Sequence, residues 1–331
     1  MTTVAINGFG RIGRSVLRAL HESGADDLEI VAINDLAAPE TLAHALQFDS
    51  VHGRFPGQVG LSDSGLDFGR GPIRMSAERN PEDLDWADVD IALDCTGIFK
   101  TDEGAARHMA AGAGKVLISA PAKGSMKTIV YGVNHGDITS DDTVVSNGSC
   151  TTNCLAPVAH VLHEAYGIKR GTMTTVHAYT SGQPVHDRAA NDFARARAAT
   201  LSMVPTSTGA AKAIGLVLPH LEGRLFGTSI RVPTPNVSCI DLTVEVETAT
   251  DAEAVNALLK AQAEGPLKSV MAVEDRTLVS IDFNHDPASS TVMSGETHVL
   301  DGHMIRVLAW YDNEWGFSNR MLDVARVMAA A

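Results

Sequence analysis

The chain has 331 residues, of which 44% are hydrophobic and 20% charged, a composition typical of a globular protein long enough for two domains. Its net charge of −14 disfavours nonspecific binding to nucleic acid or to an anionic membrane surface. No apolar run is long enough to cross a bilayer, and the first residues lack a signal-peptide pattern. The four cysteines fit neither a disulfide framework nor a zinc-binding spacing, so we expect no metal site and a reducing, cytoplasmic environment.

Short apolar runs alternate with helical patterns in the first half of the chain, which indicates a parallel α/β sheet with crossover helices. Strands are expected at 4–7, 28–33, 91–94, 116–119 and 143–146. A glycine-rich turn separates the first strand from a helix that ends near Glu22.

This turn has the pattern of a dinucleotide-binding loop, because Gly8, Gly10 and Gly13 follow a strand and open a helix. Glycines there allow a tight turn and let a pyrophosphate approach the helix N-terminus. Arg11 inside the loop is either a surface charge or lies against that pyrophosphate. Asp35 ends the next strand, where a carboxylate accepts hydrogen bonds from the adenosine ribose and repels a 2′-phosphate. The pattern therefore favours NAD over NADP, and a glycine turn without a ligand is the less favoured alternative.

Hydroxyl and amide side chains surround Cys150 in the run Ser-Asn-Gly-Ser-Cys-Thr-Thr-Asn-Cys at 146–154. Apolar residues then recur at helical spacing, so Cys150 is expected in the first turn of a helix, where the dipole favours a thiolate and lowers the thiol pKa. Together with His177, this pattern indicates covalent catalysis. The alternative is that both residues are structural, but so polar a run is poor core material.

The second half of the chain has a different pattern. Residues 239–247 alternate between apolar and polar side chains, which predicts a half-exposed strand in an antiparallel or mixed sheet. Thr250 and Glu253 predict a capping box that begins a helix ending near Ala263. A strand is expected at 304–311 and a closing helix at 319–330.

Hydrogen-bond donors gather in four further segments. They are Ser149 and Thr151 beside the cysteine, Thr180 after His177, Thr206-Ser207-Thr208-Gly209 before a helical pattern, and Arg231 in Ile-Arg-Val-Pro-Thr-Pro-Asn. Each alone is more often a helix cap or a surface feature. Hydroxyls, a helix N-terminus and one arginine together fit an anion site.

Five motifs follow one another along the chain. They are Gly-Phe-Gly-Arg-Ile-Gly-Arg at 8–14, Ser-Cys-Thr-Thr-Asn-Cys at 149–154, Thr-Ser-Thr-Gly-Ala-Ala-Lys at 206–212, Arg-Val-Pro-Thr-Pro-Asn at 231–236 and Trp-Tyr-Asp-Asn-Glu-Trp-Gly at 310–316. They closely resemble the motifs of phosphorylating glyceraldehyde-3-phosphate dehydrogenases. The match runs in order from residue 4 to about residue 326, and the cysteine motif is highly specific.

The resemblance implies a Rossmann NAD-binding domain at 1–149, with a C-terminal helix at 315–331 packing back on it. It also implies a catalytic α+β domain at 150–314 with a mixed, largely antiparallel sheet, and a cytoplasmic homotetramer acting in glycolysis or gluconeogenesis. The implied activity is the oxidative phosphorylation of D-glyceraldehyde 3-phosphate to 1,3-bisphosphoglycerate, with reduction of NAD. No specific nucleic acid, membrane or metal is implied.

By motif position, the resemblance implies that Cys150 is the nucleophile and His177 its base. The residues implied to bind NAD are Gly8, Gly10, Arg11, Ile12, Gly13, Asp35, Arg79, Ser119 and Asn313, the last near the nicotinamide. The residues implied to hold the attacking inorganic phosphate are Ser149, Thr151, Thr208 and Gly209, and those for the C3 phosphate are Thr180 and Arg231.

The chain departs from the family pattern in the segment 181–193. The family usually has an acidic residue near Gly182, and its basic stretch is replaced here by Ala-Ala-Asn-Asp-Phe at 189–193. The alternative enzyme is erythrose-4-phosphate dehydrogenase, which shares the nucleophile and the Asp-Phe-Asn-His-Asp-Pro run at 282–287, although the intact Thr-Ser-Thr-Gly motif favours the glyceraldehyde substrate. A non-catalytic nucleotide-binding regulatory paralogue is the alternative from another class, and the retention of Cys150 and His177 argues against it.

Overall fold

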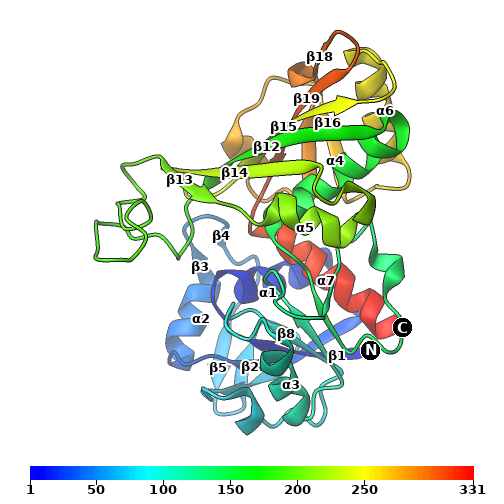
Figure 1. Ribbon diagram of the computed structural model, residues 1–331. Helices are drawn as coiled ribbons and strands as arrows, with labels where there is room; N and C mark the ends of the chain where they lie inside the picture. Colours follow the sequence, from blue (N-terminus) through cyan, green and yellow to red (C-terminus); the bar gives the residue numbers. More distant parts are fainter. The chain divides into compact units, whose positions relative to one another are not determined.

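A computed structural model describes all 331 residues, Met1–Ala331, and the chain divides into two compact units. Unit 1 comprises residues 1–129, 135–149 and 318–331. Unit 2 comprises residues 130–134 and 150–317. Figure 1 shows the chain from its blue N-terminus to its red C-terminal helix.

Unit 1 is built on a nine-stranded sheet with the order β10-β11-β9-β8-β1-β2-β7-β6-β5. These strands are β1 (Thr2–Asn7), β2 (Leu28–Asn34), β5 (Gly60–Ser62), β6 (Gly65–Asp67), β7 (Pro72–Ser76), β8 (Ile91–Asp94), β9 (Lys115–Ile118), β10 (Lys127–Thr128) and β11 (Val144–Ser146). Its other elements are the hairpin β3 (Phe48–Asp49) and β4 (Gly53–Arg54), the helices α1 (Arg11–Ser23), α2 (Pro39–Gln47) and α3 (Asp102–Ala110), and the short 3₁₀ helices η1 (Pro81–Asp83) and η2 (His135–Asp137).

The strands from β10 to β7 run parallel, whereas β7, β6 and β5 form an antiparallel edge. This arrangement confirms the Rossmann sheet that was expected for the first half of the chain. Gly13 of α1 lies against Ile6, whereas Ala105 of α3 packs with Ala5, so the two helices cover opposite faces of β1. Helix α7 (Trp315–Ala330) ends in unit 1, where Arg326 forms an ion pair with Asp27.

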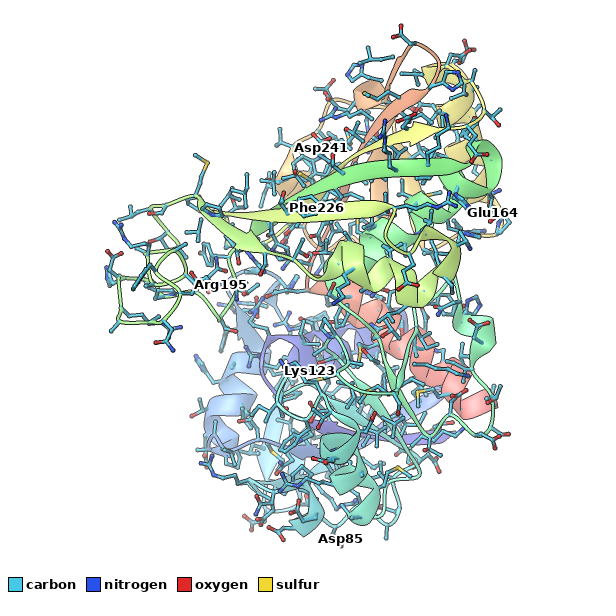
Figure 2. The ribbon with its side chains drawn as sticks, viewed as in Figure 1. Asp85, Lys123, Glu164, Arg195, Phe226 and Asp241 are labelled. Carbon is cyan, nitrogen blue, oxygen red and sulfur yellow. The ribbon has the colours of Figure 1, made fainter.

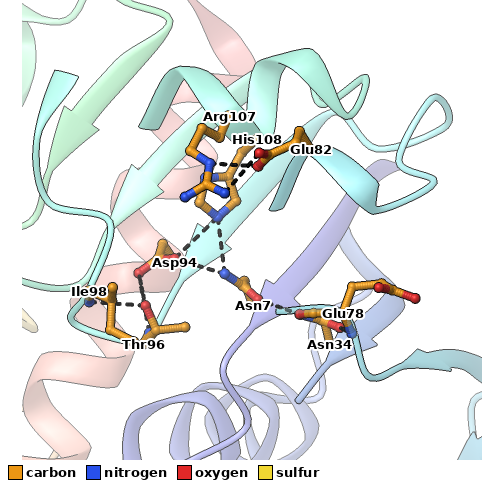
Figure 3. A network of polar contacts seen from close by, with 9 residues as sticks. All are labelled: Asn7, Asn34, Glu78, Glu82, Asp94, Thr96, Ile98, Arg107 and His108. Carbon is orange, nitrogen blue, oxygen red and sulfur yellow. Dashed lines mark hydrogen bonds and ion pairs between the residues drawn. The ribbon is translucent and has the colours of Figure 1, made fainter. Parts of the chain in front are cut away.

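A buried polar network lies at the carboxyl ends of β1, β2 and β8 (Figure 3). Asn7 Nδ2 donates to Asp94 Oδ2 at 3.0 Å, and Asn34 Nδ2 donates to Asn7 Oδ1 at 2.8 Å. His108 from α3 places Nε2 3.1 Å from the same Asp94 oxygen. Buried polar groups cost free energy unless they are hydrogen-bonded, so this network holds the loops that follow the three strands. Ligands of doubly wound sheets bind at this edge.

Unit 2 is built on a mixed eight-stranded sheet with the order β13-β14-β12-β15-β19-β17-β16 and β18 paired with β19. Its strands are β12 (Ile168–Ala178), β13 (Val204–Ser207), β14 (Leu225–Val232), β15 (Ser238–Val246), β16 (Met271–Glu274), β17 (Ser290–Met293), β18 (His298–Leu300) and β19 (Met304–Tyr311). Its helices are α4 (Cys150–Tyr166), α5 (Ala210–Val217), α6 (Ala252–Glu264), and the 3₁₀ helices η3 (Pro219–Leu221), η4 (Ser280–Phe283) and η5 (Ser294–Glu296).

One apolar core joins α4, α5 and α6 to a single face of this sheet. Ile240, Leu242 and Val244 of β15 point into the core, as their alternation predicted. The other face carries Phe226 and Asp241, both labelled in Figure 2. Most neighbouring strands are antiparallel, although β12 pairs in parallel with β14 and β16 with β17. The expected mixed, largely antiparallel sheet is therefore confirmed.

Two helix starts differ from the expected positions because an aspartate supplies the cap. The side chain of Asp251 accepts a hydrogen bond from Ala254 N, so the capping box expected at Thr250 is wrong and α6 begins at Ala252. Asp312 Oδ1 accepts from Trp315 N, so α7 begins at Trp315, as the resemblance implied, and four residues before the Asn319 that the sequence pattern predicted.

The glycine loop gives a test of local packing in unit 1. A Cβ atom at Gly13 would collide with the carbonyl oxygen of Gly8, whereas a Cβ atom at Gly10 would meet nothing within 4 Å. We expect Gly13→Ala to lower the free energy of unfolding by about 1–3 kcal/mol, the usual cost of overpacking. Gly10→Ala, at an ordinary φ of −73°, is the matched control and should change it little. Urea unfolding followed by circular dichroism measures both, and equal losses would contradict this packing.

Candidate active site

Cys150 and His177 are in contact in unit 2. Cys150 is the first residue of α4, as expected, and His177 lies at the end of β12. The sulfur of Cys150 is 3.4 Å from Nε2 of His177. The imidazole is 3% exposed, so one ring nitrogen faces the thiol in an environment that largely excludes water.

Arg231 lies beside the imidazole because β12 and β14 pair in parallel with His177 opposite Arg231. Arg231 Nη1 lies 2.7 Å from His177 Nδ1 and donates to the carbonyl oxygen of Ala178 at 3.0 Å. His177 Nδ1 is 2.6 Å from the same oxygen. The carbonyl can only accept and the guanidinium can only donate, so these two contacts require opposite forms of Nδ1. We assign the proton of the neutral imidazole to Nδ1, because Arg231 Nη1 already has the Ala178 carbonyl as its acceptor. The lone pair of Nε2 then faces the thiol of Cys150.

The environment of this pair favours the neutral form of both groups. Burial, and then the positive charge of Arg231, lower the pKa of His177 to about 3. Burial raises the pKa of the Cys150 thiol, although Arg231 and hydrogen bonding with Thr151 lower it. The expectation of a lowered thiol pKa at the helix N-terminus is therefore wrong, because desolvation of the sulfur outweighs the nearby positive charge. The free site holds a thiol next to a neutral base.

Tyr311 is a buried site residue that the sequence patterns did not identify. Its hydroxyl is 2.9 Å from Oγ1 of Thr151 and 2.9 Å from Oγ1 of Thr175. Its ring meets that of His177 edge to face, with the centroids 5.9 Å apart. Tyr311 therefore ties the first turn of α4 to β12. Its place in the Trp-Tyr-Asp-Asn motif was the signal available for finding it.

The turn after β19 contains a buried carboxylate, Asp312, that holds the neighbouring Asn313. Asp312 Oδ2 accepts from the backbone N–H of His285 at 2.7 Å and from Asn236 Nδ2 at 2.8 Å. Asp312 Oδ1 accepts from the backbone N–H groups of Glu314 and of Trp315, the first residue of α7. The carboxylate is thus satisfied by several donors, which fixes the backbone position of Asn313.

The expected phosphate residues have different environments. Thr208 Oγ1 accepts from Ala210 N, so it lies with Gly209 at the N-terminus of α5. Thr180 is exposed, and its backbone N–H donates to Gln183. Thr151 is buried against Tyr311. Ser149 belongs to unit 1 and directly precedes α4.

The glycine loop of unit 1 fits a pyrophosphate. Helix α1 begins after Gly10 with no side-chain cap and no acidic residue in its first turn, which contains Ile12. No N-cap side chain therefore occupies this helix end, where backbone N–H groups and the helix dipole can bind an anion. The absence of a Cβ at Gly8 and Gly13 keeps the loop close to β8 and α1, since added side chains would collide there.

Asp35 is held by the glycine loop itself. One carboxylate oxygen accepts from the backbone N–H of Phe9 at 2.7 Å, and the other from that of Ala37 at 3.0 Å. The half-buried carboxylate keeps acceptor capacity for ribose hydroxyls.

The remaining expected nucleotide residues differ in exposure. Arg11 forms an ion pair with the buried Asp49, and Arg79 is exposed. Ser119 directly follows β9, and its backbone N–H donates to Asp94.

None of the helices combines the length and apolar character needed to span a membrane.

Two family models match the chain. Residues 2–102 match the model described as glyceraldehyde 3-phosphate dehydrogenase, NAD binding domain, and residues 149–313 match the C-terminal domain of the same enzyme. The chain is 62% identical over 325 residues to a glyceraldehyde-3-phosphate dehydrogenase of Cereibacter sphaeroides, with 98% of each chain covered. It is 60% identical over 327 residues to that of Xanthobacter flavus, again with 98% of each covered. The identity to that of Geobacillus stearothermophilus is 52% over 330 residues, covering 99% of this chain and 98% of the relative.

The raised pKa of Cys150 predicts how its thiol reacts with iodoacetamide in the absence of nucleotide. Only the thiolate reacts, and the pKa of Cys150 is raised from 9.0, so the rate should still be rising above pH 9. Cys150 should react before Cys154 and Cys239, which are 0% and 5% exposed. Mass-spectrometric peptide mapping measures both.

The second part of this experiment removes the positive charge of Arg231, which lies near the sulfur of Cys150. Arg231→Leu should raise the pKa of Cys150 further and slow alkylation at pH 8. Arg197→Leu removes an exposed charge paired with Asp187 and should have little effect. A rate that reaches its plateau below pH 7 would show instead that the thiolate is already formed in the free site.

Proposed function

This chain belongs to the glyceraldehyde-3-phosphate dehydrogenase family, and from that premise we propose how its residues carry out the reaction. It is an NAD-dependent oxidoreductase of glycolysis that converts D-glyceraldehyde 3-phosphate and inorganic phosphate to 1,3-bisphosphoglycerate. The observation that carries the proposed mechanism is the contact between the Cys150 sulfur and His177 Nε2.

The first step is addition of the thiol to the aldehyde. Nε2 of His177 takes the thiol proton as the sulfur bonds to the carbonyl carbon, and returns it to the carbonyl oxygen, which gives a hemithioacetal. The backbone N–H of Cys150, at the N-terminus of α4, and His177 stabilise the developing oxyanion. A free aldehyde does not release hydride readily, which is why this covalent step is needed.

Oxidation and phosphorolysis follow at the same sulfur. NAD, when bound, would supply the acceptor for the hydride that leaves the C–H bond of the hemithioacetal. Nε2 of His177 takes the hydroxyl proton as that C–H bond breaks, which leaves a thioester on Cys150. Inorganic phosphate then attacks the thioester carbonyl, the C–S bond breaks, and the sulfur recovers the proton from His177. A thioester is more reactive toward phosphate than a serine ester, which explains the cysteine.

We assign the two phosphate groups to different segments of the chain. Arg231 and Thr180 would hold the C3 phosphate, and the half-buried guanidinium of Arg231 supports this because it makes no ion pair with a carboxylate. Ser149, Thr151, Thr208 and Gly209 would hold the attacking inorganic phosphate. The N-termini of α4 and α5 support this assignment, because the positive end of a helix dipole attracts an anion.

NAD would be held by residues at the carboxyl edge of the unit 1 sheet. Gly8, Gly10, Ile12 and Gly13 would cradle the pyrophosphate, and Asp35 would accept from the ribose. We further assign Arg11, Arg79 and Ser119 to the nucleotide, and Asn313 of unit 2 to the nicotinamide. The uncapped N-terminus of α1 is the feature that supports this set best.

The assembly that we propose is a cytoplasmic homotetramer. The loop between β12 and β13, which contains Arg195 (Figure 2), exposes the apolar side chains of Val185, Phe193, Leu201 and Met203 to extents of 65–86%. Apolar groups exposed together on one segment favour contact with another chain. The four cysteines are all free, which fits a reducing compartment.

The activity is tested by following NADH absorbance after addition of aldehyde and phosphate. Wild-type protein should produce NADH, and Cys150→Ala should abolish production because no covalent adduct forms. NAD binding by the variant, measured by calorimetry, should remain nearly intact, since the nucleophile does not anchor the cofactor. Activity of Cys150→Ala within tenfold of wild type would rule out the covalent mechanism.

Arg231 is tested by comparing phosphorylated and unphosphorylated aldehydes. A buried charge-assisted contact with phosphate is worth roughly 2–4 kcal/mol, so Arg231→Leu should lower kcat/KM for glyceraldehyde 3-phosphate by about 30-fold or more. The loss with glyceraldehyde should be much smaller, because that substrate has no phosphate. Arg197→Leu serves again as the control. Equal losses on the two aldehydes would mean that Arg231 acts only through His177.

A further inference from the structure

Ser238 connects the catalytic histidine segment to Asn313 through two hydrogen bonds. It is the first residue of β15 and is fully buried. Its Oγ accepts from the backbone N–H of Ala178 at 3.0 Å. Its Oγ also lies 2.9 Å from Oδ1 of Asn313. Ala178 directly follows His177, and its carbonyl oxygen is the one that accepts from Arg231 and from the imidazole.

The direction of this hydrogen-bond chain is determined by its first member. The backbone N–H of Ala178 can only donate, so the Ser238 oxygen is the acceptor there. The single proton of the Ser238 hydroxyl is then available for its other neighbour, and the neighbour must be an acceptor. The oxygen of the Asn313 carboxamide therefore faces Ser238. If the amide were rotated by 180°, the serine oxygen would accept twice and its buried proton would have no partner.

The NH₂ group of the Asn313 side chain therefore has no hydrogen-bond partner within the chain. Oδ1 of the same side chain is occupied by Ser238. The backbone of Asn313 is also held, because the preceding Asp312 is bonded on both carboxylate oxygens. The side chain thus presents a donor, rather than an acceptor, in a defined orientation.

We propose that Ser238 is a positioning residue that sets the amide of Asn313 so that Nδ2 donates to the carbonyl oxygen of the nicotinamide carboxamide. This rests on the proposed role of Asn313 as the nicotinamide contact. A donor at this position recognises the carbonyl half of the carboxamide and not its amino half. The same serine holds the strand end that carries His177, so the base and the nicotinamide contact share one support.

The orientation of the Asn313 amide is tested on wild-type protein with two dinucleotides. The 3-acetylpyridine analogue of NAD keeps the carbonyl and lacks the amino group. If Nδ2 contacts the carbonyl, calorimetry should give this analogue a Kd within about threefold of that of NAD. A loss of tenfold or more, equivalent to about 1.4 kcal/mol, would show that Asn313 accepts from the amino group and would overturn the proposal.

The role of Ser238 is tested with Ser238→Ala and three ligands. The variant should bind NAD and the acetylpyridine analogue about tenfold more weakly, because the amide of Asn313 is no longer oriented. Its affinity for ADP-ribose, which lacks the nicotinamide, should not change. Ser290→Ala is the matched control, because Ser290 is also a buried serine of unit 2 but its hydroxyl has no partner. This control should bind all three ligands as wild type does.

A double-mutant cycle separates this inference from the function on which it rests. In an Asn313→Ala background, Ser238→Ala should weaken NAD binding by less than twofold further, since the amide that it orients is absent. A full tenfold loss in that background would overturn the role of Ser238 while leaving Asn313 in place. An Asn313→Ala variant with unchanged NAD affinity would instead refute the nicotinamide contact itself.

Discussion

The parallel pairing of β12 with β14 is the constraint on which the chemistry of this site depends. It sets His177 opposite Arg231, and a slip of one residue would turn the guanidinium to the other face of the sheet. With no carboxylate paired to Arg231, its charge acts on the imidazole and on the sulfur of Cys150. The imidazole of His177 therefore stays neutral, and the positive charge of Arg231 stays available to pair with an anionic group of the substrate.

The same region shows how buried polar groups position catalytic atoms in this fold. Tyr311 joins α4 to β12, and Asp312 joins the end of β19 to the start of α7. Each group has been removed from water and would be costly without its partners, so the arrangement resists small displacements. The Asn7–Asp94–His108 network has a comparable role at the edge of the unit 1 sheet.

Strongly patterned segments were predicted well from the sequence, and weakly patterned ones were not. Strands 91–94 and 304–311 were placed at their observed bounds, because continuous apolar runs or strict alternation leave little choice. Helix α2 was missed, since only Leu42 and Leu46 of its nine residues are buried and the apolar stripe is narrow. The strands β3 to β6 have two or three residues each, too few to show a period.

The sequence by itself determined the glycine loop, the acidic residue after β2 and the cysteine at the start of α4, because each depends on neighbours close in the chain. Only the tertiary structure decided the protonation of the pair. Local reasoning predicted a lowered pKa for Cys150 from the helix end, whereas burial by distant elements raises it. The contacts of Arg231, Tyr311 and Ser238 likewise join strands far apart in sequence, and desolvation depends on everything packed around a group rather than on its neighbours in the chain.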